Sequence, residues 1–479
     1  MVTRRCGPHA APLGLLGAVA ALLAPLLAGC TLITDSFLTN DFSGDPFPIG
    51  VDTSSGAVLV GVRPGPDAAD RRAVLDLLSP FTLVDSGPDV EPSLTYVDLT
   101  LLGAGKDGSL TLPRARFRDA QLLSLHPCAV TDPADPQCRV GTPPGDLHAF
   151  DAVIGADTLA GDAIRLRLDA QQIFVLADVG GSDRGRTLDC DAVFGSPYRG
   201  GGTLVLAGTE LPFGNRRITL RSCLGPDVDP HPDTTLPIDR STFRQHGTDA
   251  LFVVSTGIGI SILGRAAYDR YVAAVAADVL PSPLTPVPFD QLAPASVSLP
   301  SGEVTGRRAT IDRIALVATS TSNALSPCRQ LYAHRLLTTY KLTDSACKLD
   351  DNGNSPVDCP CKSGQLFCGV PAILELTPPA GIDVLVVDDT EPTLQALRTE
   401  LRPDQPEVDG ILGTGVLRGA EIDVDYPHDR LLGRCPGAGC LARPALAQEQ
   451  DLCSVNRCLP GATQPTSCSS NSLPEVRAR

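Results

Sequence analysis

Two segments of this 479-residue chain match each other without a gap at a fixed offset of 258 positions. Residues 151–164 align with residues 409–422, and Asp, Gly, Leu, Gly and Ile recur at the same places. Each copy continues into an alternating strand pattern, at 165–168 and at 423–426. Chance similarity among small apolar residues is the alternative, but ordered agreement without gaps favours an internal duplication. The chain is therefore expected to contain one structural unit twice.

A second pair of similar segments precedes the first pair within each unit. Residues 81–87, FTLVDSG, resemble residues 251–257, LFVVSTG. Each unit thus has an apolar strand followed by a turn of the form Asp/Ser-Ser/Thr-Gly. Later in the unit comes an apolar-apolar-Gly segment that ends at Gly155 in the first copy and at Gly413 in the second.

Short β-rich runs between Gly, Pro and Asp clusters dominate the chain. The clearest expected strands are 56–62, 96–102, 164–168, 202–206 and 382–387. Helical patterns are few, and the two expected helices are 265–277 and 391–401. The 45 Gly and 43 Pro residues argue against a helical bundle, while 43% apolar residues suffice for a large core. The predicted fold class is all-β with minor helices.

This order of motifs resembles that of the pepsin-like aspartic peptidases, over roughly residues 47–434. The resemblance implies a bilobal double β-barrel made by internal duplication, with an N-terminal lobe at 47–200 and a C-terminal lobe at 201–434. In that family each lobe supplies an Asp-Thr/Ser-Gly turn and an apolar-apolar-Gly segment beside it. The matching N-lobe residues are Asp85, Ser86, Gly87 and Gly155, and the matching C-lobe residues are Ser255, Thr256, Gly257 and Gly413.

The sequence departs from the family at the residues that carry the chemistry. Aspartic proteolysis needs two carboxylates that share one proton, so that one acts as base on a water and the other as acid on the carbonyl. Ser255 stands where the second carboxylate is expected, and a serine hydroxyl does not hold or release a proton near neutral pH. Pro88 and Ile258 follow the turns where the family usually has Ser or Thr. Tyr96 is too close to the first turn to be the tyrosine of the family's flap.

These departures predict a catalytically inactive protein that keeps a peptidase scaffold. It would bind an unknown peptide, glycan or partner protein through the cleft between the lobes, or serve as a structural protein of the envelope. Ser86 and Thr256 are expected to retain a hydroxyl-to-backbone lock between the lobes. The alternative is an active aspartic endopeptidase in which Asp85 works with an unorthodox partner carboxylate, supplied for example by a second subunit.

The start of the chain has the form of a bacterial lipoprotein signal peptide, expected to span residues 1–29. Basic residues precede a short apolar run at 13–27, which ends in Leu-Ala-Gly-Cys30. This resembles the lipobox, in which the cysteine is lipidated and becomes the new N-terminus. An ordinary signal peptide that happens to carry a cysteine is the alternative. Residues 30–46 would form a tether, and Thr31 favours the outer membrane as the lipid-anchored destination.

Cysteine content agrees with export. Of 16 cysteines, 14 remain after the leader and the lipidated residue are set aside, and an even number in an exported chain predicts disulfides. Cys128 with Cys138 and Cys435 with Cys440 are plausible local pairs. The connectivity within a third group cannot be deduced from spacing; its members are Cys328, Cys347, Cys359, Cys361 and Cys368.

No cofactor and no metal is predicted. Asp350, Asn352 and Asn354 offer oxygen ligands for calcium, but the spacing is not that of an EF-hand and the twelfth-position Glu is absent. A disulfide-clamped solvated loop is favoured there, and disulfides are favoured over a zinc-thiolate site. The surrounding stretch, about 323–370, is interpreted as an insertion in the second lobe, and residues 435–479 as a disulfide-bonded tail.

Charge and motif content exclude several other classes. A formal net charge of −16 argues against nucleic acid as a partner, so membrane contact is expected through the lipid anchor alone. The chain contains no G-x-S-x-G and no H-E-x-x-H, which weakens serine-hydrolase and zincin assignments. The glycines at 413–419 lack dinucleotide-loop spacing and run into a strand, so that assignment is rejected.

Overall fold

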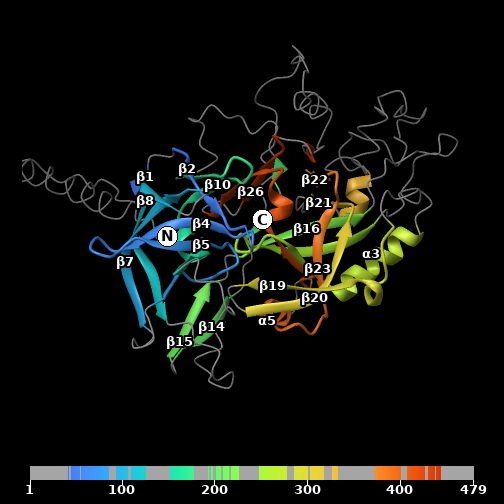
Figure 1. Ribbon diagram of the computed structural model, residues 1–479, viewed down its shortest axis with the longest axis horizontal. Coiled ribbons are helices and arrows are strands. Elements are labelled where there is room, and N and C mark those ends of the chain that lie inside the picture. Colours follow the sequence, from blue (N-terminus) through green and yellow to red (C-terminus); the bar gives the residue numbers. More distant parts are fainter. Residues whose placement is uncertain are drawn as a thin grey trace, which may run out of the picture.

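The computed structural model is mostly β-strand with few helices (Figure 1). It describes residues 41–42, 45–53, 55–85, 93–105, 109–125, 151–176, 192–193, 196–197, 201–206, 209–214, 217–225, 247–277, 285–299, 302–317, 326–332, 373–400, 407–426, 430–436 and 439–443. The segments before residue 177 lie mainly at the left of the view, and those after residue 217 lie mainly at the right. Together these features are the pepsin-like bilobal β fold that the duplicated motifs predicted.

The N-terminal half builds a sheet of eight strands. Along the sheet the order is β1-β8-β6-β9-β5-β4-β3, and β7 pairs with β4 and β8. The strands are β1 (Asp41–Phe42), β3 (Gly50–Val51), β4 (Val58–Pro64), β5 (Arg71–Leu75), β6 (Leu83–Asp85), β7 (Ser93–Ala104), β8 (Leu110–Leu125) and β9 (Ala152–Ile154).

The C-terminal half builds a sheet of eleven strands. The order is β19-β20-β23-β18-β24-β17-β16-β21-β22-β27, and β13 pairs with β16. The strands are β13 (Ser196–Pro197), β16 (Ile218–Gly225), β17 (Thr248–Val254), β18 (Ser261–Gly264), β19 (Ala293–Leu299), β20 (Gly302–Ile311), β21 (Arg313–Val317), β22 (Ile373–Leu376), β23 (Ile382–Val387), β24 (Gly410–Leu412) and β27 (Cys440–Arg443).

The same local topology appears in both sheets. In the first sheet β9 pairs in parallel with β5 and antiparallel with β6. In the second sheet β24 pairs in parallel with β17 and antiparallel with β18. The apolar-apolar-Gly segments that matched in sequence are β9 and β24. The internal duplication inferred from sequence is therefore present in the strand pairing.

A six-stranded sheet joins the two halves, in the order β12-β26-β25-β10-β11-β2. Its strands are β2 (Phe47–Pro48), β10 (Ala163–Arg167), β11 (Gln172–Leu176), β12 (Ala192–Val193), β25 (Glu421–Asp425) and β26 (Arg430–Arg434). At its centre β10 of the first unit lies antiparallel to β25 of the second. A separate hairpin is formed by β14 (Gly201–Leu206) and β15 (Thr209–Gly214).

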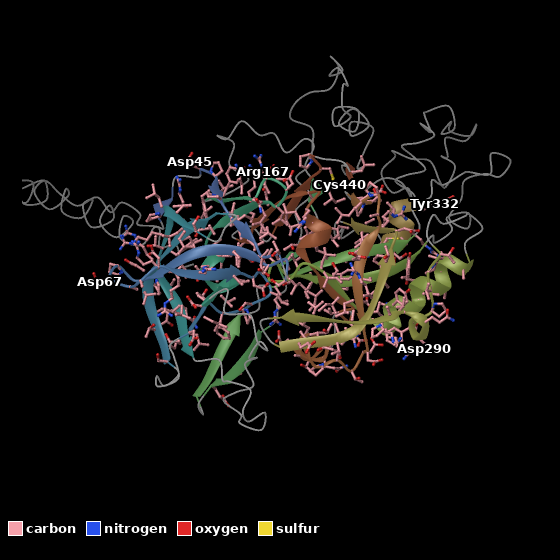
Figure 2. All side chains as sticks on the ribbon, in the orientation of Figure 1. Asp45, Asp67, Arg167, Asp290, Tyr332 and Cys440 are labelled. Atoms are coloured by element: carbon pink, nitrogen blue, oxygen red, sulfur yellow. A yellow bond between two sulfur atoms is a disulfide. The ribbon has the colours of Figure 1, made fainter. Side chains whose placement is uncertain are left out.

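The two predicted helices are confirmed as α3 (Arg265–Ala277) and α5 (Pro392–Glu400). Tyr268 and Tyr271 of α3 are buried, and the Tyr268 hydroxyl donates to the carbonyl of Val287 at 2.7 Å. Each of the predicted strands overlaps an observed one. One apolar cluster includes side chains from the N-terminal sheet, the C-terminal sheet and the six-stranded sheet, so the two halves share a core (Figure 2).

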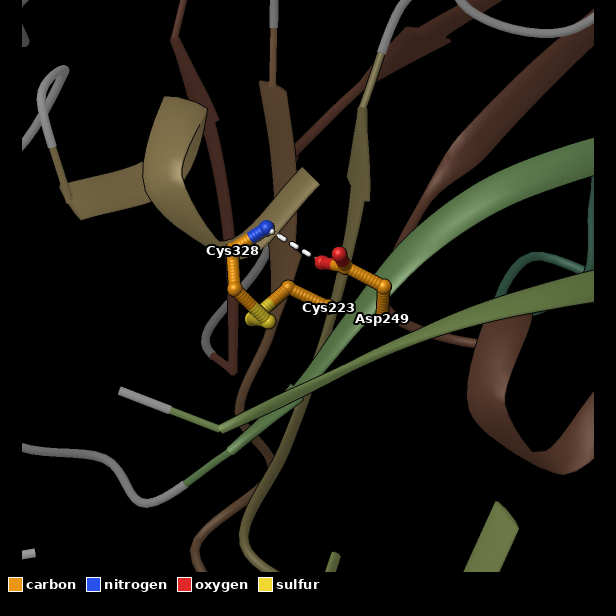
Figure 3. Close-up of a disulfide and its surroundings, with 3 residues drawn as sticks. All are labelled: Cys223, Asp249 and Cys328. Carbon is orange, nitrogen blue, oxygen red and sulfur yellow. Dashed lines mark hydrogen bonds between the residues drawn. A yellow bond between two sulfur atoms is a disulfide. The ribbon is translucent and has the colours of Figure 1, made fainter. Parts of the chain in front are cut away.

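Two disulfides lie in the described part of the chain. The predicted Cys435–Cys440 bridge is confirmed. The second bridge joins Cys223 of β16 to Cys328, 105 positions away, beside Asp249 (Figure 3). The Asp249 carboxylate accepts the Cys328 N–H at 2.8 Å, and burial raises the pKa of this carboxyl. Among the described helices none has the length and apolarity required to cross a bilayer.

Candidate active site

The centre of the duplicated fold is the place where the turn after β5 meets the turn after β17. Asp76 follows β5 and Ser255 follows β17. The Asp76 N–H donates to the Ile154 carbonyl at 3.0 Å, and the Ser255 N–H donates to the Leu412 carbonyl at 3.0 Å. Because Ile154 and Leu412 end the matching strands β9 and β24, Asp76 and Ser255 occupy equivalent positions in the two units.

These two side chains contact each other directly. The Ser255 hydroxyl donates to Asp76 Oδ1 at 2.9 Å. The same oxygen accepts the N–H of Leu78 at 3.0 Å and the N–H of Gly257 at 3.2 Å. The Gly257 N–H also lies 3.1 Å from Ser255 Oγ. The groups that bind the carboxyl group of Asp76 are thus a hydroxyl and backbone N–H groups.

The pair is nearly inaccessible to solvent. Asp76 is 7% exposed and Ser255 is 1% exposed. Burial raises the pKa of Asp76, because the ionised carboxylate loses water, and the bonds from Leu78, Ser255 and Gly257 only partly oppose this rise.

The predicted N-lobe residue Asp85 does not lie opposite Ser255, so the assignment of residues 85–87 as the counterpart of 255–257 is wrong. Asp85 ends β6, and its N–H donates to the carbonyl of Asp151, just before β9 begins. Asp76 is bonded instead to Ile154, at the other end of β9. Three strand residues separate these ends by roughly 10 Å.

Ser86 and Gly87 lie outside the described residues, as does Pro88. The expected lock between the lobes is made by Thr256. Its hydroxyl donates to the Leu75 carbonyl at 2.6 Å and accepts the Leu77 N–H at 3.1 Å. The position equivalent to Thr256 in the first unit is Leu77, which has no hydroxyl and so cannot make the matching hydrogen bonds to the second unit.

Leu77 is instead part of an apolar region between the turn and the six-stranded sheet. It borders a small pocket together with Leu166 of β10 and Ile422 of β25. Ile258, where the family usually has Ser or Thr, is likewise buried. Leu77 and Ile258, two of the positions that depart from the family motif, are therefore buried apolar residues.

Gly155 and Gly413 are required because each passes close to the loop that follows its turn. A side chain at Gly155 would place Cβ 2.3 Å from the Phe81 carbonyl oxygen, and one at Gly413 would place it 2.5 Å from that of Ile260. The Gly155 N–H donates to Thr82 Oγ1 at 3.0 Å, and the Gly413 N–H donates to Ser261 Oγ at 3.0 Å. Both sequence-predicted glycines thus support the turns.

Sequence reasoning missed Asp76 because the residues that follow it are Leu-Leu and not Ser/Thr-Gly. A usable signal was present. Asp76 follows the apolar end of β5, and a hydroxyl residue, Thr82, comes six positions later. Ser255 is followed at the same spacing by Ser261. The Asp-Ser-Gly sequence at 85–87 matches the family motif more closely, and for that reason it was assigned as the turn in place of residues 76–78.

The first lobe makes further contacts with the second around the site. The Gly259 N–H donates to the Ser55 carbonyl at 2.6 Å, and the Arg217 Nε–H donates to the Leu78 carbonyl at 2.9 Å. Gly56 has a φ of +72°, and a Cβ there would lie 2.3 Å from Gly259 Cα. These backbone and side-chain contacts hold the two lobes together around the site.

No group of three or more His, Cys, Asp or Glu side chains among the described residues is arranged to hold a metal ion. The calcium candidates Asp350, Asn352 and Asn354 lie outside those residues. So do Cys30, the proposed Cys128–Cys138 pair, and the cysteines at 347, 359, 361 and 368.

Solved structures that are similar to this chain over most of its length include the following two. An aspartic proteinase from Irpex lacteus is 11% identical, with 82% of this chain and 97% of that chain covered and a TM-score of 0.32. Basic 7S globulin from soybean is 11% identical, with coverage of 81% and 94% and a TM-score of 0.36. No family model and no curated protein matches the sequence. At this level of similarity neither structure assigns an activity to this chain.

Proposed function

We propose that this protein is a catalytically inactive member of the pepsin-like fold, anchored by lipid at the cell envelope and used for binding or as a structural protein. The observation that carries the proposal is the 2.9 Å hydrogen bond from Ser255 Oγ to Asp76 Oδ1. Ser255 in this pair stands where an aspartic peptidase needs its second carboxylate.

The chemistry of the pair supports inactivity. In an aspartic peptidase one carboxylate takes a proton from water while the other, already protonated, polarises the substrate carbonyl. Asp76 can fill one of these roles at a time. Ser255 can fill neither, because an alkyl hydroxyl has no accessible ionised form and does not share a proton with its partner as a carboxylate does. The attacking water would lack either its base or the acid that completes the reaction.

The test is cleavage of a denatured protein substrate at acid pH by the full-length chain in detergent. The wild-type chain is expected to show no cleavage above a buffer blank. Ser255→Asp restores a carboxylate pair, and a Ser255→Asp/Leu77→Thr/Leu78→Gly variant also restores the family's turn. We expect activity to appear in at least one of these variants and to disappear when Asp76→Asn is added.

Asp85→Asn is the matched control, because Asp85 lies at the far end of β9 from the pair. It should leave any restored activity unchanged. Wild-type cleavage that is lost in Asp76→Asn would overturn the proposal and make the chain a peptidase with an unorthodox partner. Wild-type cleavage lost only in Asp85→Asn would instead support the alternative that begins from that residue.

The lipid anchor is a separate part of the proposal and rests on the leader and Cys30. The expected product is a chain that begins at an acylated Cys30 and partitions with the outer-membrane fraction. Mass spectrometry of the mature N-terminal peptide measures the modification, and Cys30→Ser should release the protein into the soluble fraction. A mature N-terminus at another residue would contradict it.

A further inference from the structure

The two central strands of the six-stranded sheet pair in a symmetric register. Arg165 of β10 lies opposite Asp423 of β25, and Arg167 lies opposite Glu421. Arg165 and Asp423 are 258 positions apart, which is the offset of the duplication. Each is therefore the other's equivalent, and a local two-fold axis between the units passes through this pair.

The side chains of these strands alternate between two faces. Ile164 and Leu166 of β10 join the shared core with Ile422 and Val424 of β25. On the other face Ala163 lies opposite Asp425, and the remaining positions carry opposite charge on the two strands. The charged residues of this face are Arg165 and Arg167 on β10, and Glu421, Asp423 and Asp425 on β25.

Four of these charges make a network between the lobes, in which three side chains are buried and Arg167 is partly exposed. Arg165 Nε lies 2.5 Å from Asp423 Oδ1 and 3.1 Å from Glu421 Oε1, and Arg167 Nε lies 2.5 Å from Glu421 Oε2. The side chains of Arg165, Glu421 and Asp423 are 5%, 6% and 4% exposed. Buried charges require a partner of opposite sign, and a like charge in that place is strongly unfavourable.

Because the pair lies on the two-fold axis, pairing of identical lobes would place each residue against itself. Two N-lobes would bring Arg165 against Arg165 at a buried position. Two C-lobes would bring Asp423 against Asp423 and Glu421 against Asp425. Only unlike lobes neutralise these charges.

We propose that Arg165 and Arg167 facing Glu421 and Asp423 make the interlobe sheet selective for unlike lobes, so that the N-lobe binds a C-lobe, its own or that of a second copy, and rejects another N-lobe. If two chains exchange lobes, the N-lobe of each chain therefore pairs with the C-lobe of the other. The rejected arrangement is the one that would bring two Asp76 turns together. This selectivity does not depend on whether the Asp76–Ser255 pair is active.

The test uses two full-length single variants, Arg165→Asp and Asp423→Arg, carrying different affinity tags. Each variant alone has like charges at the axis and should lose roughly 5 °C or more in melting temperature. When the two variants are co-expressed, they can exchange lobes. One interface then has the wild-type pair Arg165 and Asp423, and the other has the same pair with its charges reversed. We expect a 1:1 complex with twice the mass of one chain, detected by tandem-tag purification and native mass spectrometry.

The doubly reversed chain, Arg165→Asp/Asp423→Arg, should recover most of the lost melting temperature as a monomer. Arg308→Asp with Asp383→Arg is the matched control, since this pair is exposed and both partners lie in the C-terminal sheet. It should give no mixed complex. Single variants as stable as wild type would overturn the proposal, as would destabilised singles whose mixture forms no complex. A double reversal that recovers no stability would overturn it as well.

Discussion

At the scale of single residues, Asp76 is a carboxyl group kept in a core that disfavours its charge. Four groups offset the cost: the Ser255 hydroxyl and the backbone N–H groups of Leu78, Thr256 and Gly257. In a two-carboxylate site this arrangement would tune an acid and a base. With a serine opposite, the same bonds hold two turns of the chain together.

The raised pKa of Asp76 predicts a specific pH dependence of stability. At pH values below the ordinary aspartate pKa, the carboxyl is protonated in both the folded and the unfolded chain. As the pH rises, the unfolded chain ionises first, so Asp76 lowers the free energy of unfolding until its folded-state pKa is passed. Each unit of difference between the two pKa values is worth about 1.4 kcal/mol.

Asp76→Asn removes this titration and should gain stability relative to wild type as the pH rises from 3 to 7. Urea unfolding at several pH values measures the difference. Asp67→Asn, at an exposed position, is the control and should show no such trend. A difference between Asp76→Asn and wild type that stays constant with pH would show that Asp76 has no raised pKa.

Thr256 provides a second prediction at this scale. Thr256→Val keeps the shape but leaves the Leu75 carbonyl and the Leu77 N–H without their buried partner. An unsatisfied buried group costs about 1–3 kcal/mol, so the variant should lose several kcal/mol of unfolding free energy. Thr256→Ser retains the hydroxyl and should lose much less. Equal losses in the two variants would assign the effect to packing.

At the scale of elements, β9 and β24 are each followed directly by a glycine, Gly155 or Gly413, that passes close to a neighbouring loop. Both strands could be identified from the sequence because their motif repeats at one offset. Each glycine is kept because any side chain there would collide with the backbone of the neighbouring loop. Gly155→Ala and Gly413→Ala should each lower the free energy of unfolding by at least ~2 kcal/mol, since a Cβ would meet backbone oxygen.

Gly161→Ala is the control for these two changes. Gly161 belongs to the same repeated motif, but a Cβ there meets nothing within 4 Å. Its unfolding midpoint should stay near that of wild type. A tolerated Gly155→Ala or Gly413→Ala would contradict the close packing of these segments against the turns.

At the scale of the whole molecule, the Cys223–Cys328 bridge closes a loop of 105 positions, whereas Cys435–Cys440 spans only 5. Loop entropy predicts a larger contribution from the longer loop, about 4.7 kcal/mol for ~100 residues. Cys223→Ser/Cys328→Ser should therefore lose more stability than Cys435→Ser/Cys440→Ser. Thermal unfolding of the two double variants measures this, and the opposite order would contradict it.

Much of the molecule could be predicted from the sequence because duplication and periodicity are local patterns. The helix at 265–277, the repeated strands and the C-lobe turn at Ser255 were predicted in this way. Asp76 could not be found by motif, because Leu77 and Leu78 stand where such a turn usually has a hydroxyl residue and a glycine. The Arg165–Asp423 network likewise depends on strand register across the two units, which neither segment reveals alone.

The most direct test of the missing second carboxylate is the titration of Asp76 in the full-length chain. Selective ¹³C labelling of aspartate carboxyls allows this by NMR, with Asp76→Asn to assign the signal. We predict a single step with a pKa above the ordinary aspartate value, and two coupled steps in Ser255→Asp. Two coupled steps in the wild-type chain would contradict the account, because they would reveal a second carboxylate sharing the proton.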